Sequence, residues 1–507
     1  MHIAIIGAGF AGLSTAKVLT QFGFDVTVFD KAPDVGGVWS RTRRYPGLTT
    51  QNGRSTYAMS DFPMPKSYPE WPSGQQVQEY LASYAAHFDL TPKLRLNTEV
   101  VSADLDEAAG RWTLRLRDTG GKDDLAPVVA DHLVVANGVF CDPFVPDYLG
   151  AEEFAEAGGR LRHASTMTEL ADARGKSVLV VGYGKSSCDV AAALSDVASS
   201  TTVVARNLIW KMPKKLGNVL NYKYLLLTRL GEGLFRYIKP RGFERFLHGP
   251  GRPVRNSMLG SIQSLVTRQL KLHKLGLVPD GPLERIARST VSLVTDRFYD
   301  KVASGDIVVR RDCEIRRLLV QDGRPAAELE DGTILPADLV VCGTGFHQRV
   351  PCLSAALQQR ITDDQGNFAL YRQIQPHDIT QLSFVGYNSS LFSPLSAEVA
   401  ALWIAALLSG GLELPSVEAR RAFVAERLRW MEERTEGKHA RGTNIVPFSV
   451  HNIDEMLEDI GIGVGRAVRF KEWLAPVNPA DYAPITRKLL ARIGAPSESR
   501  EVGVGSH

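Results

Sequence analysis

The hydrophobic pattern of the first 30 residues predicts a strand, a helix and a second strand. A short apolar run, HIAIIG, leads into a glycine-rich turn, and AGLSTAKVLTQFG then repeats apolar positions at intervals of three and four. Short apolar runs favour buried strands, and the three- and four-residue interval favours a helix with one buried face. The run DVTVFD follows and ends at Asp30. We expect a strand–helix–strand unit over residues 2–30.

The same order of elements recurs about 175 residues later along the chain. The apolar run SVLVVG precedes a second glycine-rich turn, the stretch SSCDVAAAL has helical spacing, and TTVVARN reads as the next strand. Repeated strand–helix–strand units are typical of α/β folds with parallel sheets. The pattern therefore predicts an α/β protein with two units of one design.

The first glycine turn carries the spacing of a dinucleotide-binding site. Gly7, Gly9 and Gly12 form GxGxxG between the predicted strand and helix. Such glycines permit a tight turn and let a pyrophosphate approach the positive N-terminus of the helix. Asp30 lies 21 residues after Gly9, at the end of the second strand, where a carboxylate accepts hydrogen bonds from ribose hydroxyls.

The second glycine turn predicts a site for a different nucleotide. Gly182, Gly184 and Ser186 lie in this turn, and Ser187 takes the place of the third glycine. The next strand carries Arg206 instead of an acid, 22 residues after Gly184. A guanidinium group suits a 2′-phosphate, which a carboxylate would repel. We expect NADPH here; the alternative is a solvent-facing arginine at a strand end.

Further glycines favour FAD in the first site. Gly37 and Trp39 belong to a GGVW stretch after the first unit, Gly138 lies near the end of the run HLVVANGVF, and Gly345 lies near the end of the run LVVCGTGF. A flat redox ring requires close backbone approach, which glycines supply; the alternative is that these are ordinary turns. Two nucleotide sites of unequal kind suggest a relay in which one cofactor stays bound while the other exchanges.

Composition limits the class of protein. A chain of 507 residues with 44% hydrophobic and 23% charged residues is a multidomain globular protein. Its five cysteines form no CxxC pair, which argues against a disulfide reductase and favours a reduced, cytoplasmic protein. We expect no signal peptide, no transmembrane segment and no metal site, because the apolar runs are short and His and Cys residues show no ligand spacing.

Several motifs together carry a resemblance to a known superfamily. GAGFAG, GGVW, YPGL before SDFPMP, VVGYGKSSCDVA, VVARN, LVVCGTGF, and FVGYNSS before SAEVAALW resemble those of class B flavin-dependent monooxygenases, the flavin-containing and Baeyer–Villiger monooxygenases. The resemblance covers most of residues 1–210 and 305–410. It implies that NADPH reduces FAD, that oxygen adds to flavin C4a, and that the (hydro)peroxyflavin inserts one oxygen atom into a small organic substrate.

The residue expected beside the flavin departs from the family pattern. N- and S-oxygenating relatives place an asparagine after the YPGL-like stretch, and Baeyer–Villiger relatives place an aspartate there. The position falls on Gln51, with Asn52 beside it. These two amides are the candidate catalytic residues, and the choice between N/S-oxygenation and Baeyer–Villiger oxidation stays open.

Two further family features match only in part. The interdomain fingerprint FxGxxxH has Ala157 in place of phenylalanine, whereas Gly159 and His163 agree. The arginine that assists Baeyer–Villiger enzymes has no single counterpart, although Arg285 and Arg288 lie in the corresponding region.

The expected architecture consists of two Rossmann-like dinucleotide-binding domains, with the NADPH domain inserted in the FAD domain. The first part of the FAD domain, the NADPH domain, the second part of the FAD domain and a C-terminal segment are expected at residues 1–155, 156–325, 326–450 and 451–507. The cleft between the two domains is the expected active site.

A basic helical insert at about 207–300 is the least familiar part of the chain. It holds 17 Lys and Arg against 6 Asp and Glu, a balance of +11, whereas the whole chain carries +3. The alternatives are a solvated basic face, a substrate lid, contact with an anionic membrane surface or docking of an acidic carrier protein. We expect no nucleic-acid partner, because no recognition module accompanies the charge. An oxidase or redox sensor that binds FAD and NADPH without oxygen transfer is the alternative function.

Overall fold

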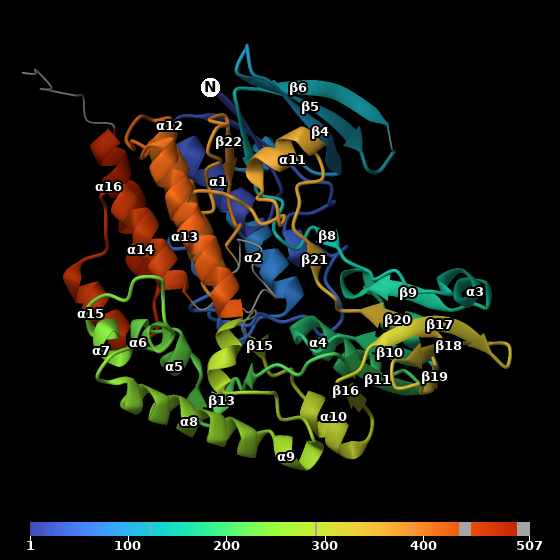
Figure 1. The fold of residues 1–507 in the computed structure, drawn as a ribbon. Helices are drawn as coiled ribbons and strands as arrows, with labels where there is room; N and C mark the ends of the chain where they lie inside the picture. Colours follow the sequence, from blue (N-terminus) through green and yellow to red (C-terminus); the bar gives the residue numbers. More distant parts are fainter. Residues whose placement is uncertain (122, 289–291, 389, 436–447, 494–507) are drawn as a thin grey trace, which may run out of the picture.

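The computed structural model describes residues 1–121, 123–288, 292–388, 390–435 and 448–493. Two five-stranded parallel sheets organise the fold, one at the top and one at the lower right of Figure 1. The chain is therefore an α/β protein with parallel sheets, as the hydrophobic pattern predicts.

The first sheet has the strand order β22-β7-β1-β2-β3, and all its neighbours are parallel. Its strands are β1 (His2–Ile6), β2 (Asp25–Phe29), β3 (Leu94–Arg95), β7 (His132–Val135) and β22 (Leu382–Phe384). Helix α1 (Phe10–Gln21) follows β1 and packs against α12 (Ser393–Leu408). Helix α12 begins at Ser393, with Pro394 in its first turn.

The second sheet has the order β16-β11-β10-β20-β9 and is also parallel throughout. Its strands are β9 (Arg160–His163), β10 (Ser177–Val181), β11 (Ser200–Ala205), β16 (Val308–Arg311) and β20 (Leu339–Cys342). Helix α4 (Lys185–Leu194) follows β10. The strand–helix–strand units predicted around the two glycine turns are confirmed as β1–α1–β2 and β10–α4–β11.

The chain returns from the second sheet to the first sheet later than we expected. A boundary between residues 325 and 326 falls inside β18 (Arg324–Leu329), which pairs with β17 (Ile315–Gln321) and β19 (Ile334–Pro336) in an antiparallel sheet. This sheet leads directly into β20, which inserts between β10 and β9. The chain returns to the first sheet only after β20.

The two crossings between the sheets lie side by side. Strand β8 (Asp142–Pro143) follows β7 of the first sheet, and β21 (Phe346–His347) follows β20 of the second. They pair antiparallel with each other. The chain thus leaves the first sheet and returns to it through one two-stranded connection.

Further elements from both halves of the chain surround this framework. Beside the first sheet lies an antiparallel sheet of β4, β5 and β6. The elements are the 3-10 helix η1 (Gly37–Trp39), α2 (Gly74–His87), β4 (Thr98–Asp106), β5 (Arg111–Asp118), β6 (Asp124–Ala130), α3 (Ala151–Glu156) and α11 (Ala355–Ile361).

The basic insert is largely helical, as predicted, and extends along the bottom of Figure 1. Its elements are β12 (Lys211–Met212), β13 (Lys215–Leu216), β14 (Leu220–Asn221), α5 (Lys223–Leu226), α6 (Arg229–Gly233), α7 (Phe243–Leu247), α8 (Arg252–Gln269), α9 (Leu272–Leu275), the 3-10 helix η5 (Leu283–Arg288), β15 (Ser292–Leu293) and α10 (Phe298–Ser304).

The C-terminal helices pack against both the first sheet's helices and the insert. Helix α14 contacts α12, and α15 contacts α6. These helices are α13 (Val417–Thr435), α14 (Ser449–Asp459), α15 (Arg466–Leu474) and α16 (Pro484–Ile493). The expected C-terminal segment 451–507 is described to residue 493.

In the described part of the chain, no helix combines the length and the apolarity that crossing a membrane requires.

Candidate functional site

The first glycine turn has no room for side chains at two of its three glycines. Gly7 has φ +110°, and a Cβ atom there would lie 2.4 Å from the carbonyl oxygen of Ala136. A Cβ atom at Gly12 would lie 1.7 Å from the carbonyl oxygen of Gly7. Gly9 caps α1, and a Cβ atom there would lie 3.5 Å from the Cα of Gly37 in the GGVW stretch. Bare backbone from both stretches therefore meets at the N-terminus of α1.

Asp30 lies beside this turn. Its carboxylate accepts hydrogen bonds from the backbone N–H groups of Ala8 (2.7 Å) and Ala32 (2.8 Å). Burial raises the pKa of Asp30, and the two backbone hydrogen bonds oppose that rise. Each oxygen uses one lone pair in this way and keeps another, so the carboxylate can also accept from ligand hydroxyls.

The other residues predicted for the first site lie apart from one another. Trp39 is buried in η1, edge-on to Tyr57 with ring centroids 6.0 Å apart. Gly138 (φ +76°) follows β7, whereas Gly345 (φ +87°) follows β20 of the second sheet. The carbonyl oxygen of Gly345 accepts a hydrogen bond from Nε2 of His163 (2.9 Å). Gly345 and His163 thus meet at the crossing between the sheets.

The second glycine turn tolerates serine at its third position because a neighbouring strand supplies another glycine. A Cβ atom at Gly343 would lie 2.0 Å from Oγ of Ser187, so glycine at 343 makes the space that Ser187 fills. Gly182 has φ +102° and packs against the Gly343 backbone. Gly184 caps α4, and an added Cβ there meets open space. The N-terminus of α4 is therefore accessible.

Ser186 lies in the first turn of α4, and Arg206 lies just after the next strand of the sheet, β11. Ser186 accepts a hydrogen bond from the hydroxyl of Tyr45 (3.3 Å), which belongs to the loop after the GGVW stretch. Arg206 follows β11, its side chain is 73% exposed, and its Nε lies 3.4 Å from Glu314. Exposed ion pairs contribute little to stability, so this guanidinium group can turn to a phosphate at small cost.

Gln51 and Asn52 join three separate segments. Asn52 is only 2% exposed; its Nδ2 donates to the carbonyl oxygen of Leu391, before α12. Its Oδ1 accepts from the hydroxyl of Tyr222 in the insert (2.9 Å), and that hydroxyl also lies 2.7 Å from the Gln51 carbonyl oxygen. Oε1 of Gln51 accepts from the backbone N–H of Leu293 (3.1 Å). The two amides are thus held between the insert and the segment leading into α12.

Tyr222 is a contact that sequence reasoning missed. It is fully buried, and burial raises the pKa of its hydroxyl, so this group is a neutral hydrogen-bond donor. Tyr222 lies 170 positions from Asn52, within the basic insert. No spacing signal in the sequence links the two residues.

A buried charge cluster ties α1 to α12. Lys17 lies 2.5 Å from Asp61 and 3.2 Å from Glu398, and both Lys17 and Glu398 are 1% exposed. Glu398 also accepts from the backbone N–H of Ser60 (2.9 Å). This cluster fixes the segment that follows Gln51 and Asn52 against both helices. The lysine on the predicted helix, just before the apolar pair VL, was the available signal for Lys17.

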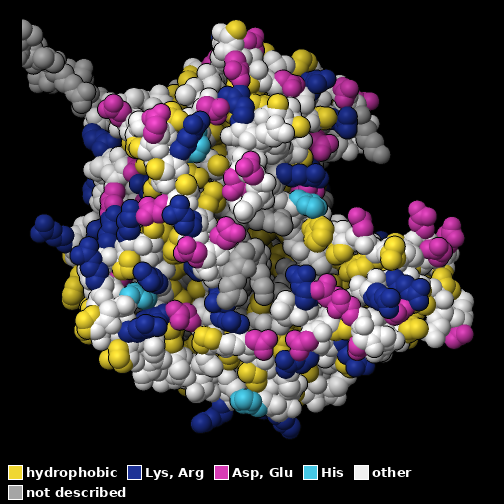
Figure 2. Space-filling model, in the orientation of Figure 1, with side chains coloured by type: hydrophobic (Ala, Val, Ile, Leu, Met, Phe, Trp, Pro, Cys, Tyr) yellow, Lys and Arg dark blue, Asp and Glu magenta, His cyan; other side chains and the backbone are white. Residues whose placement is uncertain are grey.

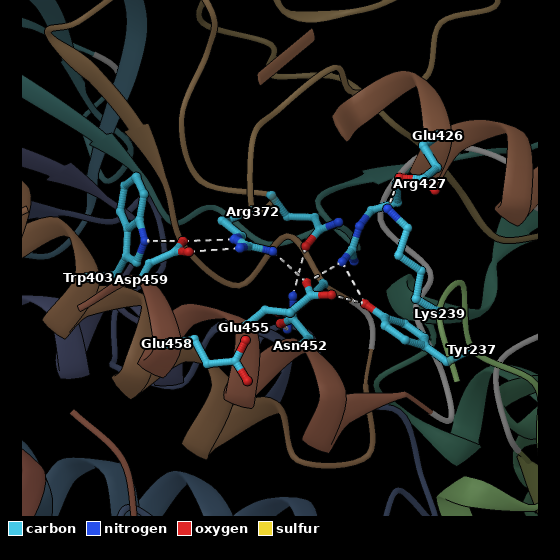
Figure 3. Close-up of polar contacts among 12 residues, drawn as sticks. Tyr237, Lys239, Arg372, Trp403, Glu426, Arg427, Asn452, Glu455, Glu458 and Asp459 are labelled. Carbon is cyan, nitrogen blue, oxygen red and sulfur yellow. Dashed lines mark hydrogen bonds and ion pairs between the residues drawn. The ribbon is translucent and has the colours of Figure 1, made fainter. Parts of the chain in front are cut away.

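A second buried network joins the C-terminal helices to the insert (Figure 3). Arg372 donates to Glu455 (2.8 Å) and Asp459 (2.7 Å) of α14. Arg427 of α13 donates to Glu455 (2.6 Å) and to the hydroxyl of Tyr237 (2.8 Å). Burial alone would raise the pKa of Glu455, but the charges of Arg427 and Arg372 outweigh it and lower that pKa.

Comparisons with known proteins give one matching family and several structures of similar fold. A family model described as flavin-binding monooxygenase-like (FMO-like) matches residues 1–465. The chain is 26% identical to a probable flavin-containing monooxygenase 1 of Arabidopsis thaliana over 525 aligned positions, covering 95% of this chain and 96% of that protein.

Two solved structures share the fold. The S-allyl-L-cysteine S-oxygenase from Allium sativum has a TM-score of 0.61 at 18% identity, covering 97% of each chain. The cyclohexanone monooxygenase from Rhodococcus sp. Phi1 bound to NADP⁺ has a TM-score of 0.66 at 18% identity, covering 91% of this chain and 97% of that one.

Proposed function

Because the chain belongs to the flavin-binding monooxygenase-like family, it is an FAD- and NADPH-dependent monooxygenase, and we propose that its two glycine turns hold the two cofactors. The enzyme uses molecular oxygen and a small organic substrate. The observation that carries the assignment of the sites is the pair of bare helix N-termini, one on each parallel sheet.

We propose that FAD occupies the first turn. Gly7, Gly9 and Gly12 would hold the diphosphate, and Asp30 would accept the ribose hydroxyls. The spare lone pairs of Asp30 and the close approach of Gly9 to Gly37 support this fit. Trp39, Gly138 and Gly345 would lie along the rest of the cofactor. When bound, FAD supplies the electron transfer and oxygen activation that side chains lack.

We propose that NADPH occupies the second turn. Gly182 and Gly184 would let the diphosphate approach α4, Ser186 would donate to it, and Arg206 would bind the 2′-phosphate. Support comes from the open space at Gly184 and from the weak exposed pair that occupies Arg206. The NADPH unit would be inserted in the FAD unit, with boundaries at the paired crossings β8 and β21, where strand pairing divides the sheets.

Gln51 and Asn52 would place polar amides at the reacting end of the cofactors. Tyr222 donates to Asn52 Oδ1, which orients the amide with Nδ2 toward Leu391 and leaves its second N–H hydrogen for a ligand. Holding a neutral amide in a buried setting excludes water and provides a donor without a titrating charge. Tyr222 acts through Asn52 and is therefore a positioning residue.

Rapid-mixing spectroscopy tests this function. The FAD-loaded protein is reduced with NADPH without oxygen and then mixed with oxygenated buffer while the flavin spectrum is recorded. We expect a long-lived absorbance band distinct from oxidised and reduced flavin. Direct return to oxidised flavin with stoichiometric hydrogen peroxide would contradict oxygen transfer and indicate an oxidase or redox sensor.

We also propose that the basic insert, with α15, contacts an anionic membrane surface. Hydrophobic side chains gather over α7 and α15 at the lower left of Figure 2, with Lys and Arg side chains nearby. The exposed rings of Phe243 and Phe246 stack at 5.5 Å, and Phe243 meets Trp473 at 5.9 Å. Phe470 and Leu474 are each 72% exposed. Aromatic residues beside basic ones are typical of interfacial membrane contacts.

We propose a reducing compartment, the cytoplasm, as the place where the enzyme works. All five cysteines are free thiols. Burial raises the pKa of the Cys342 and Cys352 thiols to about 12, which keeps them protonated and unreactive. Free, inert cysteines are typical of intracellular proteins.

A further inference from the structure

Lys211 of the insert is a buried lysine that contacts the second glycine turn. Its side chain is only 2% exposed, and Nζ donates to the carbonyl oxygen of Tyr183 (2.7 Å), which lies between Gly182 and Gly184. Nζ also donates to Oγ of Ser292 (3.2 Å) and lies 4.8 Å from the centroid of the Tyr183 ring. A carbonyl, a hydroxyl and an aromatic ring carry no net charge, so this buried cation rests on neutral groups.

The positive charge beside the turn is not balanced by the acid nearest to it in the sequence of α4. Within the described part of the chain, Lys211 forms no ion pair with a carboxylate. Asp189 of α4 is paired with Lys185, the first residue of that helix. Burial lowers the pKa of Lys211, which reflects the cost of this charge. Two lysines and one aspartate thus leave one excess positive charge at the start of α4, where the helix dipole already favours an anion.

The contact with Lys211 fixes the direction of one peptide group. In a trans peptide the C=O and N–H bonds point to opposite sides. The carbonyl oxygen of Tyr183 points to Lys211, so the N–H of Gly184 in the same peptide points away from it. This N–H has no acceptor among the described residues, and an added Cβ at Gly184 would meet open space. The N–H group is therefore free to donate to a ligand at the start of α4.

The first glycine turn holds the corresponding peptide in a different way. Ala8 takes the place of Tyr183 between the two glycines, and its carbonyl oxygen accepts from the backbone N–H of Gly36 (2.9 Å). A neutral amide thus holds the first turn, whereas a cation holds the second. A charged donor binds the carbonyl oxygen more strongly and also attracts an anion on the other side of the peptide. The charge at Lys211 therefore does more than shape the turn.

We propose that Lys211 is a positioning residue for the nucleotide in the second turn. This inference rests on the proposed function, in which NADPH occupies that turn. Lys211 would hold the peptide between Tyr183 and Gly184 with its N–H toward the diphosphate, and its charge would offset part of the negative charge of the diphosphate. Lys211 acts on the diphosphate, which NADPH and NADH share, whereas Arg206 would act on the 2′-phosphate, which only NADPH carries.

This difference can be measured by calorimetry on the full-length, FAD-loaded protein with NADP⁺ and with NAD⁺. The variant Lys211→Met keeps the length of the side chain and removes its charge. Losing a charge-assisted hydrogen bond weakens binding about tenfold or more. We therefore expect Lys211→Met to weaken binding of both nucleotides by the same factor, about tenfold or more. Arg206→Ala should weaken binding of NADP⁺ alone.

The pH dependence of binding separates the charge of Lys211 from a merely structural contact. The groups that face Nζ are Lys185, Cys188 and Asp189 of α4, Tyr183 of the turn and Ser292 of β15. Burial raises the pKa of the Cys188 thiol and of the Tyr183 hydroxyl, which keeps both groups neutral. A bound anion favours the charged form of Lys211, so NADP⁺ binding should take up protons and weaken as pH rises from 8 to 10. The 2′-phosphate titrates at about pH 6 and does not contribute in this range.

Lys211→Met should lose this pH dependence. The matched control is Lys215→Met, an exposed lysine of the same insert, which should bind both nucleotides as the unchanged protein does. If Lys211→Met does not fold, proton uptake by the unchanged protein decides the question. Calorimetry in two buffers of different ionisation enthalpy measures that uptake.

The outcomes separate this inference from the proposed function. NADP⁺ binding that Arg206→Ala weakens but Lys211→Met leaves unchanged would overturn the role of Lys211 alone. Affinity of the unchanged protein that stays constant from pH 8 to pH 10, without proton uptake, would overturn it as well. Failure of the unchanged protein to bind NADP⁺ at all would instead contradict the proposed function.

Discussion

Individual residues in the two glycine turns are constrained for different reasons. Gly12 has no space for a Cβ atom, because the Gly7 carbonyl oxygen would lie 1.7 Å away. At Gly184 an added Cβ would meet no atom within 4 Å among the described residues, apart from its own neighbours in the chain. The fold therefore explains the glycine at position 12. At position 184 it does not, and the bare helix end is what a bound diphosphate would require.

Arg206→Ala tests the second site at this scale. Removing a charge-assisted phosphate contact costs about 1.5–3 kcal/mol, so the KM for NADPH should rise about tenfold or more while the KM for NADH stays unchanged. Steady-state reduction of the flavin with each nucleotide measures this. Arg310→Ala is the matched control, since Arg310 is exposed on the neighbouring strand. Unchanged preference for NADPH over NADH would exclude this role.

Sequence alone indicated the glycines but not their partners. A glycine turn follows from local backbone requirements, so GxGxxG and the following helix can be recognised from the sequence alone. The hydrogen bond from Tyr222 to Asn52 joins residues 170 positions apart and depends on how the insert packs. Hydrophobic spacing carries no information on such a contact. Gln51 and Asn52 were found through family likeness, whereas Tyr222 was not.

Elements of the insert and of the C-terminal segment are linked by one charged histidine. His451 at the start of α14 contacts Glu232 of α6 through Nδ1 and Glu244 of α7 through Nε2 (2.8 Å). Burial disfavours its charge, but the hydrogen bonds and charges of the two glutamates outweigh burial and raise the pKa of His451 to about 10. Three helices thus depend on a proton that an exposed histidine would lose near pH 6.5.

His451→Gln should therefore lower stability in a pH-dependent way. Because the folded-state pKa is raised, the stabilisation is fully present below about pH 6.5 and is lost as pH rises through about 10. Breaking a buried charge pair costs about 3 kcal/mol. Thermal unfolding at pH 6, 8 and 10 should show a difference from the unchanged protein that is largest at pH 6 and shrinks toward pH 10.

His273→Gln, on the exposed side of α9, provides the control and should show no such trend. A difference between His451→Gln and the unchanged protein that is constant from pH 6 to pH 10 would contradict a charged His451.

The order of elements was predictable, but the division between the sheets was not. Apolar runs separated by helical spacing identify strands and helices wherever they occur. Which sheet a strand joins depends on pairing, and LVVC would fit either sheet equally well. The antiparallel strands β17–β19 carry the chain back to the second sheet, so β20 lies there and the boundary expected near residue 326 fails.

At the scale of the whole molecule, the two crossings connect the sheets locally, whereas the insert connects parts that lie far apart. The pair β8–β21 joins the sheets through short strands, with His163 packed on Phe346 at 4.8 Å. The insert instead reaches far from its own sheet and contacts Asn52, α14 and α15. The candidate amides of Gln51 and Asn52 and the exposed surface over α7 and α15 are therefore linked through the insert, so a surface contact would act on the same elements that hold these amides.

Co-sedimentation with vesicles tests that surface. The protein should pellet with phosphatidylcholine vesicles that contain phosphatidylserine and remain in solution with phosphatidylcholine alone. Basic residues near an anionic surface contribute about 1 kcal/mol each, a contribution that salt screens, so binding should fall as salt rises. The double variant Phe470→Ser, Leu474→Ser should bind more weakly, because it removes the most exposed apolar side chains of α15. Val129→Ser, on the distant strand β6, should bind as before.

Each outcome assigns the surface to one class of partner. Binding that requires anionic lipid and depends on residues 470 and 474 would place the enzyme at a membrane. Equal sedimentation with and without anionic lipid would eliminate the membrane contact. The +11 charge of the insert would then either bind an acidic carrier protein or simply face solvent. Affinity for an acidic protein that is lost with salt would decide between those two, since a solvated face binds nothing.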